Sequence, residues 1–223
     1  MGTLLNRRRY MGGGGSPSPA GYIQDGLVFR LDGIDKGATD GTWVDLVDGV
    51  VFTNYSATSL DDGWAFDGST TYLTSSASNN FLGQNEDFTV EVCIVPARIV
   101  GKEPVFVFSQ SVNNGVLFFI SGSAVTFLQK RNTYPITRVA GSPLCVSLNL
   151  TLGMINGVNK SKNSGTDFWE NNAPYIGRRV GGNGGYFQGK IHAIRIYNKR
   201  LTEAEMLNNQ RLDNTRFNLG LTI

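Results

Sequence analysis

The sequence contains few of the residues that mark a disulfide-rich or a highly charged protein. Among its 223 residues are two cysteines and one histidine, and charged residues make up 17%, below the roughly 25% of typical globular domains. Two cysteines cannot build a disulfide framework. A net charge of +2 provides no basic surface of the kind that binds nucleic acid. We therefore expect neither a disulfide scaffold nor a nucleic-acid partner.

Long apolar runs are also absent. No stretch of about eighteen apolar residues occurs, so no membrane insertion is expected. The arginines at 7–9 are followed by glycines rather than by an apolar segment, which argues against a signal peptide. Asn6 stands where a myristoylation pattern requires Ser or Thr. We expect a chain made in the cytoplasm with no export signal.

Glycine and β-forming residues are abundant instead. Twenty-eight glycines, together with many Thr, Val, Phe and Tyr, favour short strands joined by tight turns. In residues 88–95, Val90 and Val92 share one face of a strand, and Glu91 and Cys93 share the other. About a dozen such segments, with no long helical segment between them, predict an antiparallel β-sandwich or jelly roll.

One helix is predicted near the C-terminus. Thr202 and Glu205 have the spacing of a capping box, in which each side chain accepts from the other residue's backbone N–H. Leu201 and Met206 flank the cap as a hydrophobic staple. The helix is expected to cover about residues 203–212 and to close one edge of the sandwich.

The chain divides into three parts. Residues 1–11 form a leader in which apolar residues surround three arginines, residues 12–21 are a Gly/Ser/Pro linker, and residues 22–223 contain the sandwich, helix and tail. Apolar anchors combined with arginines, which bond carboxylates in a planar fork, suit docking to another protein. The alternative is an N-terminus with no role, which is common. The predicted docking residues are Leu4, Leu5, Arg7, Arg8, Arg9, Tyr10 and Met11.

Residues 186–202 read YFQGKIHAIRIYNKRLT. This segment resembles the closing motif of laminin-G-like domains in the concanavalin A-like lectin/glucanase superfamily. GLVFRLDG, AFDGSTTYLTSS and FTVEVCIVP are similar, in the same order, to earlier strands of that family. PLCVSLNL lacks the Trp-His signature that the family usually has there. The resemblance covers about residues 22–212 and implies a two-sheet antiparallel jelly roll with one short C-terminal helix and an extended N-terminal leader.

The leader, body and tail together resemble surface proteins of phages and prophages of gut Bacteroidetes. That resemblance implies a non-enzymatic virion surface protein, such as a head fibre, a decoration protein or a tail-associated protein. Residues 1–20 would attach it to other virion proteins, as a homo-oligomer, and the lectin-like body would adhere to a bacterial surface glycan. Two alternatives remain open: a bacterial or prophage carbohydrate-binding module without a virion role, and a glycoside hydrolase.

Enzymatic activity is not expected. Retaining glycosidases need two carboxylates about 5–5.5 Å apart, which related glucanases place on one strand as E-x-D-x-x-E. Glu91 stands alone here, because Cys93 and Pro96 occupy the other two positions. His192 lies inside an alternating strand, and we expect it to face solvent or a polar pocket rather than to act in a triad.

Two loops carry candidate glycan-binding residues. Exposed aromatic rings stack on the C–H faces of sugars, planar polar groups bond the hydroxyls, and ligand sites usually lie on loops of a rigid scaffold. Core packing and turn chemistry are the alternative explanation for the same residues. Trp43 and Trp64, which are flanked by strand patterns, are expected in the core. The candidates are Trp169, Asn171, Asn172, Arg178, Arg179, Asn183 and Tyr186.

No cofactor is expected, with Ca²⁺ as the alternative. Asp32, Asp35 and Asp40 are the weak candidate ligands, because family members bind Ca²⁺ through Asp, Asn and carbonyl oxygens. Turn chemistry explains these residues without an ion. Cys93 and Cys145 are expected as free, partly buried thiols on strands, or as a disulfide between neighbouring strands.

Overall fold

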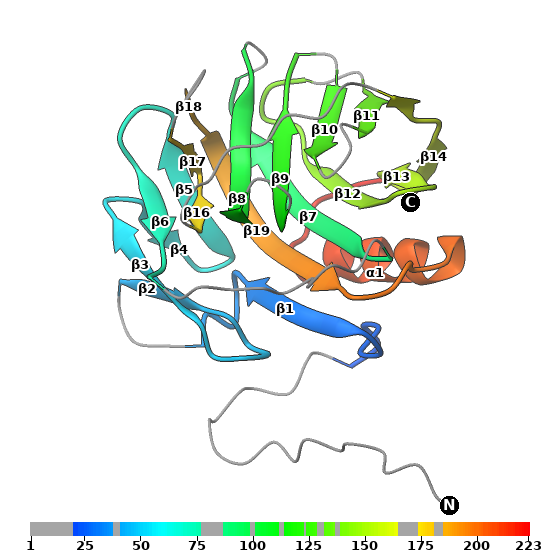
Figure 1. Ribbon diagram of the computed structural model, residues 1–223, viewed down its shortest axis with the longest axis horizontal. Coiled ribbons are helices and arrows are strands. Elements are labelled where there is room, and N and C mark those ends of the chain that lie inside the picture. Colours follow the sequence, from blue (N-terminus) through cyan, green and yellow to red (C-terminus); the bar gives the residue numbers. More distant parts are fainter. Residues whose placement is uncertain are drawn as a thin grey trace, which may run out of the picture.

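Two antiparallel β-sheets pack face to face and form a sandwich (Figure 1). The structure is a computed structural model that describes residues 20–37, 41–76, 87–98, 101–111, 114–122, 124–128, 132–136, 139–164, 174–180 and 185–223. The predicted all-β jelly-roll class is confirmed.

The first sheet has eight strands and is centred on one long strand. They are β1 (Leu27–Asp32), β4 (Thr58–Leu60), β5 (Gly63–Asp67), β7 (Thr89–Pro96), β12 (Leu144–Asn149), β13 (Gly153–Ile155), β14 (Val158–Lys160) and β19 (Gln188–Tyr197). The order is β14–β13–β12–β7–β19–β5–β4. The long strand β19 pairs with β5 through its first half and with β1 through its second half.

The second sheet has nine strands in the order β15–β11–β10–β9–β8–β16–β6–β3–β2. They are β2 (Thr42–Val44), β3 (Val51–Tyr55), β6 (Tyr72–Thr74), β8 (Glu103–Ser111), β9 (Asn114–Ile120), β10 (Ala124–Leu128), β11 (Asn132–Pro135), β15 (Asn163–Ser164) and β16 (Tyr175–Ile176). A separate two-stranded hairpin is formed by β17 (Arg178–Arg179) and β18 (Gly185–Tyr186).

The described part of the chain holds nineteen strands, more than the dozen that sequence patterns predict. The additional strands are pieces of two or three residues, such as β15 and β16. Alternation cannot reveal such strands, because it needs four or more residues to become visible. Their pairing depends on the neighbouring strands instead.

The inner faces of the two sheets enclose one apolar core. Val90 and Val92 of β7 point into this core, while Glu91 and Cys93 face the opposite side, which confirms the predicted alternation. Trp43 and Trp64 are fully buried, as predicted. The indole N–H of Trp43 donates to the carbonyl of Asp32 at 2.9 Å, so its polar edge is satisfied inside the sandwich.

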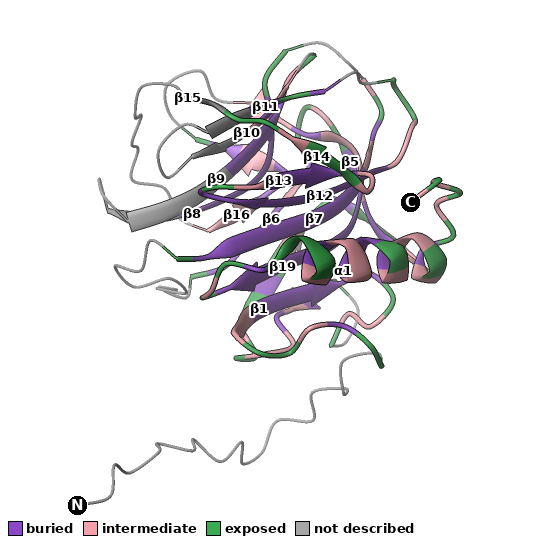
Figure 2. Ribbon diagram, turned by 90° about the vertical axis from the view of Figure 1, so that its right-hand side faces the viewer, coloured by how far each residue is buried: buried purple, intermediate pink, exposed green. Residues whose placement is uncertain are grey.

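The helix α1 (Glu203–Arg216) lies across the outer face of the first sheet (Figure 2). The predicted capping box is confirmed: Thr202 accepts from the Glu205 N–H at 3.3 Å, and Glu205 accepts from the Thr202 N–H at 2.7 Å. The helix covers a sheet face rather than an edge. Within the described residues, no helix has the length and apolar character needed to cross a membrane.

The helix also extends four residues beyond its predicted end at 212. Asp213 begins this extension, although Asp and the following Asn and Thr favour caps and turns over helix interiors. The reason is tertiary. Asp213 is buried and pairs with the guanidinium of Arg195 on β19, and the hydroxyl of Tyr22 donates to it at 2.9 Å.

Arg195 joins the helix to the sheet. Its Nε donates to Glu91 at 2.9 Å and its Nη1 to Asp213 at 2.9 Å, and all three side chains are buried. Burial opposes the charge on Arg195, but Asp213 and Glu91 together raise its pKa well above the usual value. Asn209 of α1 also donates to Glu91, at 3.0 Å. Each charged side chain of this network therefore has a hydrogen-bonded partner of opposite charge.

We predict that Arg195→Met lowers the free energy of unfolding by about 3–5 kcal/mol, because it leaves two buried carboxylates without a cation. Urea unfolding followed by circular dichroism measures this loss. The matched control is Arg200→Ala, since Arg200 pairs with Asp87 on the surface and should change stability by less than about 1 kcal/mol. Equal effects of the two substitutions would contradict a central role for the buried network.

Candidate functional site

Four tyrosines and one arginine gather on the outer face of the second sheet. Leu73 of β6 and Ile176 of β16 are fully buried in the core, so the residue before each, Tyr72 and Tyr175, faces outward. Tyr55 of β3 is the direct cross-strand partner of Tyr72. We call this set the tyrosine–arginine patch; its members are Tyr55, Tyr72, Tyr175, Arg178 and Tyr186.

The hairpin of β17 and β18 brings the last two members to the sheet. Its position is set by backbone hydrogen bonds from the Gly177 N–H to the carbonyl of Val105 at 2.8 Å and from the Phe187 N–H to the carbonyl of Gly177 at 2.9 Å. Gly177 has a φ of +78°, and a Cβ there would lie 2.4 Å from the ring of Phe66. Only glycine therefore fits this turn. Arg98 adds a hydrogen bond to the carbonyl of Tyr186 at 2.8 Å.

Arg178 lies at the centre of the patch. Its guanidinium carbon is 4.5 Å from the ring centre of Tyr72 and 5.5 Å from those of Tyr175 and Tyr186. These distances are within the range of cation–π attraction. Tyr55 extends the aromatic surface, because its ring stacks on Tyr72 at 4.6 Å with an interplanar angle of 6°.

Within the part of the chain that the structure describes, the polar groups of the patch bond no other group. Among the described residues, Arg178 has no hydrogen-bond acceptor and no carboxylate partner, and the four tyrosine hydroxyls have no hydrogen-bond partner either. Tyr55 is 47% exposed, and the other members are partly exposed. A guanidinium with five free donors and a set of accessible rings can therefore accept a ligand that has both an apolar face and acceptor oxygens.

The structure brings together two of the predicted glycan-binding residues, Arg178 and Tyr186. Arg179 points elsewhere: it is buried, and its guanidinium covers the ring of Phe119 at 5.1 Å. Sequence reasoning missed Tyr55, Tyr72 and Tyr175, because it searched loops rather than strand faces. The sequence does carry a signal for these three tyrosines, because each one alternates with core residues along its strand. Four candidates lie outside the described residues: Trp169, Asn171, Asn172 and Asn183.

The weak calcium candidates differ in their surroundings. One oxygen of buried Asp32 accepts from the N–H groups of Ile34 and Asp35, both at 3.0 Å, and from Arg216 at 2.9 Å. This carboxylate therefore stabilises a turn and pairs with the helix. Asp40 lies outside the described residues, as does the predicted docking leader: Leu4, Leu5, Arg7, Arg8, Arg9, Tyr10 and Met11.

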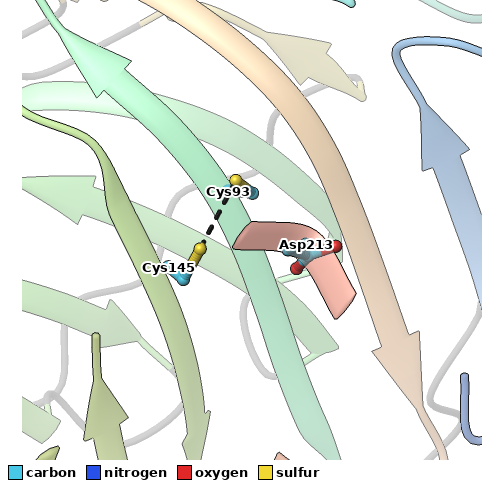
Figure 3. Close-up of side chains that lie close together, drawn as sticks. All are labelled: Cys93, Cys145 and Asp213. Atoms are coloured by element: carbon cyan, nitrogen blue, oxygen red, sulfur yellow. Dashed lines mark hydrogen bonds between the residues drawn. The ribbon is translucent and has the colours of Figure 1, made fainter. Parts of the chain in front are cut away.

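Two cysteines and one aspartate form the described group of side chains that comes closest to a metal site. The sulfurs of Cys93 and Cys145 and one carboxylate oxygen of Asp213 lie within 4.8 Å of one another (Figure 3). Both oxygens of Asp213 already accept hydrogen bonds from Arg195. Two thiols alone do not complete the four ligands of a structural zinc site, so the group does not suit a metal.

Of the two surroundings predicted for His192, solvent or a polar pocket, the structure excludes solvent. A β-bulge in β19 falls at this residue, and its ring is buried against Phe217 with 5.0 Å between ring centres. The Nδ1 atom lies 2.7 Å from the carbonyl of Asp62, and Nε2 has no partner among the described residues. Burial lowers the pKa of His192, against the opposing effect of the Asp62 carbonyl.

Comparison with known proteins agrees with this architecture. Residues 151–206 match the family model of the concanavalin A-like lectin/glucanases superfamily. This chain has a jelly-roll fold similar to that of laminin-G-like lectin domains, and we call its sandwich the laminin-G-like domain. The matched part of the laminin-G-like domain includes Tyr175, Arg178 and Tyr186, whereas Tyr55 and Tyr72 lie before it. No curated protein sequence matches the chain.

Solved structures share the fold of the laminin-G-like domain. Trypanosoma rangeli sialidase in complex with sialic acid has 15% identity and a TM-score of 0.61 over 83% of this chain and 32% of its own. A mutant of that sialidase displaying trans-sialidase activity has 15% identity and a TM-score of 0.62, over 86% of this chain and 33% of the mutant. The receptor-binding domain of botulinum neurotoxin C/D mosaic serotype has 12% identity and a TM-score of 0.59, over 85% of this chain and 52% of that domain. The chain thus spans about a third of the sialidases.

We predict that His192 lowers the stability of the laminin-G-like domain, relative to a His192→Gln variant, as the pH falls below about 6.5, the usual histidine value. His192 has a lowered pKa in the fold, so the unfolded chain binds the proton more readily and this residue favours unfolding in acid. Urea unfolding between pH 5 and 7 measures the stability of both proteins. The difference in free energy of unfolding between the original protein and His192→Gln should shift against the original protein as the pH falls. Asp45, whose pKa burial raises to about 6, titrates in both proteins and cancels in the comparison. Identical slopes of stability against pH in the two proteins would contradict this assignment.

Proposed function

We propose that this laminin-G-like domain binds a glycan through the tyrosine–arginine patch and does not hydrolyse it. The observation that carries the proposal is Arg178, which contacts three tyrosine rings and has no acceptor among the described residues. A guanidinium used for stability normally bonds a carboxylate or carbonyl. An unused one among accessible rings favours a role in binding.

The patch suits a sugar in two ways. Tyrosine rings present apolar faces for the C–H groups of a pyranose, and their hydroxyls bond polar substituents. Arg178 offers paired donors in a plane, the geometry that a carboxylate, sulfate or phosphate accepts. Glu103 is a buried carboxylate whose partner, Arg98, also bonds the carbonyl of Tyr186, and this pairing compensates the negative charge of Glu103. We therefore expect a glycan that carries an acidic group.

The proposal that the domain is not an enzyme is supported by the state of Glu91. This carboxylate accepts from Ser147 at 2.9 Å through one oxygen, and from Arg195 and Asn209 through the other. Its partner Asp213 pairs with the same arginine beneath the helix. Both carboxylates are buried, and their oxygens are bonded to side chains of the sheet and the helix.

Two structural neighbours add support, because one was solved with sialic acid bound and the other is the receptor-binding domain of a toxin. The setting that we propose is the surface of a phage virion, where residues 1–20 attach the chain to other virion proteins and the domain faces outward. The alternative is a carbohydrate-binding module of a bacterium or prophage without a virion role. The resemblance of leader and tail to phage surface proteins supports the first setting.

We predict that Arg178→Ala and Tyr72→Ala each weaken glycan binding at least about tenfold, the loss typical of a central binding residue. An array of bacterial surface polysaccharides identifies the ligand, and calorimetry with that polysaccharide measures the affinities. Chemical reduction of the carboxyl groups of the same polysaccharide should weaken its binding to the original protein. The affinity of the Arg178→Ala variant, which is already low, should change little.

The matched control is Arg211→Ala, because Arg211 is exposed on α1, away from the patch. It should bind as tightly as the original protein. Thermal unfolding of all variants shows whether the patch variants remain folded, which we expect since Arg178 holds no hydrogen bond among the described residues. Unchanged affinity in folded Arg178→Ala and Tyr72→Ala would refute glycan binding at this patch.

We predict that deletion of residues 1–20 leaves a folded domain that binds glycan but no longer joins particles. The sandwich begins after these residues, and its anchor Tyr22 is retained. Co-sedimentation with phage particles compares the deleted and full-length chains, and the control replaces residues 12–19 with a Gly/Ser linker of equal length. Failure of the full-length chain to sediment with particles would favour the carbohydrate-binding module without a virion role.

A further inference from the structure

Cys93 and Cys145 face each other across two neighbouring strands. They are direct partners in the antiparallel register of β7 and β12. Both are free and fully buried, and their sulfurs lie 3.6 Å apart (Figure 3). Since a disulfide bond is about 2.05 Å long, small changes in the two side-chain torsions would bring the sulfurs to bonding distance.

The backbone around Cys145 shows which kind of strand pair this is. The N–H of Cys145 donates to the side chain of Asn156 at 2.7 Å, and its carbonyl accepts from the N–H of Asn156 at 2.9 Å. Both backbone groups of Cys145 therefore point away from β7. Cys93 and Cys145 thus form a non-hydrogen-bonded pair, in which the Cα atoms lie about 4.5 Å apart and the side chains approach closely. That separation is within the range of disulfides, about 4.4–6.8 Å.

The C-terminal tail covers the two thiols. Phe217 packs on them together with Leu219 and Leu221. The tail is held in place by Asn214, whose side chain donates to the carbonyl of Leu221 and accepts from its N–H, both at 2.8 Å. Burial also raises the pKa of Cys93 well above the usual thiol value. Access to the sulfurs therefore depends on displacement of this segment.

We propose that Cys93 and Cys145 are a site of reversible oxidation to a cross-strand disulfide, with a small disulfide such as oxidised glutathione as the oxidant and residues 217–223 as the cover that controls access. This inference is independent of glycan binding. The product would link β7 to β12 directly beneath the helix. It closes a loop between positions 52 residues apart, which stabilises the fold by restricting the unfolded chain.

The reaction proceeds by two thiol–disulfide exchanges. The thiolate of one cysteine attacks a sulfur of oxidised glutathione, forms a mixed disulfide and releases one glutathione thiolate. The thiolate of the second cysteine then attacks the protein sulfur of the mixed disulfide, forms the Cys93–Cys145 bond and releases the second glutathione. The protein loses two electrons and two protons, glutathione disulfide gains both, and a dithiol reductant reverses the sequence.

The test uses the full chain incubated with oxidised glutathione. Free thiols are counted in denaturant, and intact mass is measured before and after treatment with dithiothreitol. We expect loss of both thiols, a mass decrease of about 2 Da with no retained glutathione, recovery of both thiols on reduction, and a higher melting temperature for the oxidised form. Asn214→Ala should react at least about fivefold faster, because it releases the tail, as local opening controls access to buried groups.

Two further variants serve as controls, one for the effect of a surface substitution on the rate and one for the role of the second thiol. Asn159→Ala, at an exposed position on β14, should react at the rate of the original protein. Cys145→Ala should retain one glutathione on Cys93. The proposal is overturned if folded Asn214→Ala keeps both thiols, if glutathione adducts persist without resolving, if the disulfide links two chains, or if the oxidised form melts at a lower temperature than the reduced one.

Discussion

The fold depends on one buried arginine that is shared by a strand and a helix. Arg195 projects from the outer face of β19 and bonds Glu91 of β7 and Asp213 of α1. Without the helix, the outer face of this sheet would expose a row of charged and polar residues. With it, each charge has a partner, and Tyr22 and the C-terminal tail pack against the same region. A buried ion pair contributes less to net stability than to fixing one arrangement of the elements around it.

The outer faces of the two sheets differ in what covers them. The helix and tail cover the outer face of the first sheet, while the outer face of the second carries the tyrosines and the β17–β18 hairpin. Arg178 and Arg179 are adjacent in sequence but have different surroundings. Arg179 is buried and covers Phe119, whereas Arg178 lies among three tyrosine rings. Arg195 is bonded throughout and Arg178 has no hydrogen bond among the described residues, and this contrast supports the proposal that Arg178 binds a ligand.

The sequence predicted the fold well because its signals are local. The capping box, the alternation in β7 and the closing motif each lie within one short segment. The β-bulge at His192 could not be predicted. Strict alternation places Ile191, Ala193 and Arg195 on one face, but the bulge turns Ala193 and Arg195 outward while Ile191 and Ile194 remain in the core. One inserted residue thus decides that the arginine meets the helix. The patch was only partly predicted, since its members come from five strands that pair over long sequence distances.

Glycan binding at the tyrosine–arginine patch is tested most directly by a titration followed by nuclear magnetic resonance. The side-chain N–H signal of Arg178 and the ring signals of the four tyrosines can be observed while the polysaccharide selected by the array is added. We predict saturable shifts at Arg178, Tyr72 and Tyr55, with the signals of α1 unchanged. Binding that shifts signals elsewhere and leaves Arg178 unaffected would contradict this prediction.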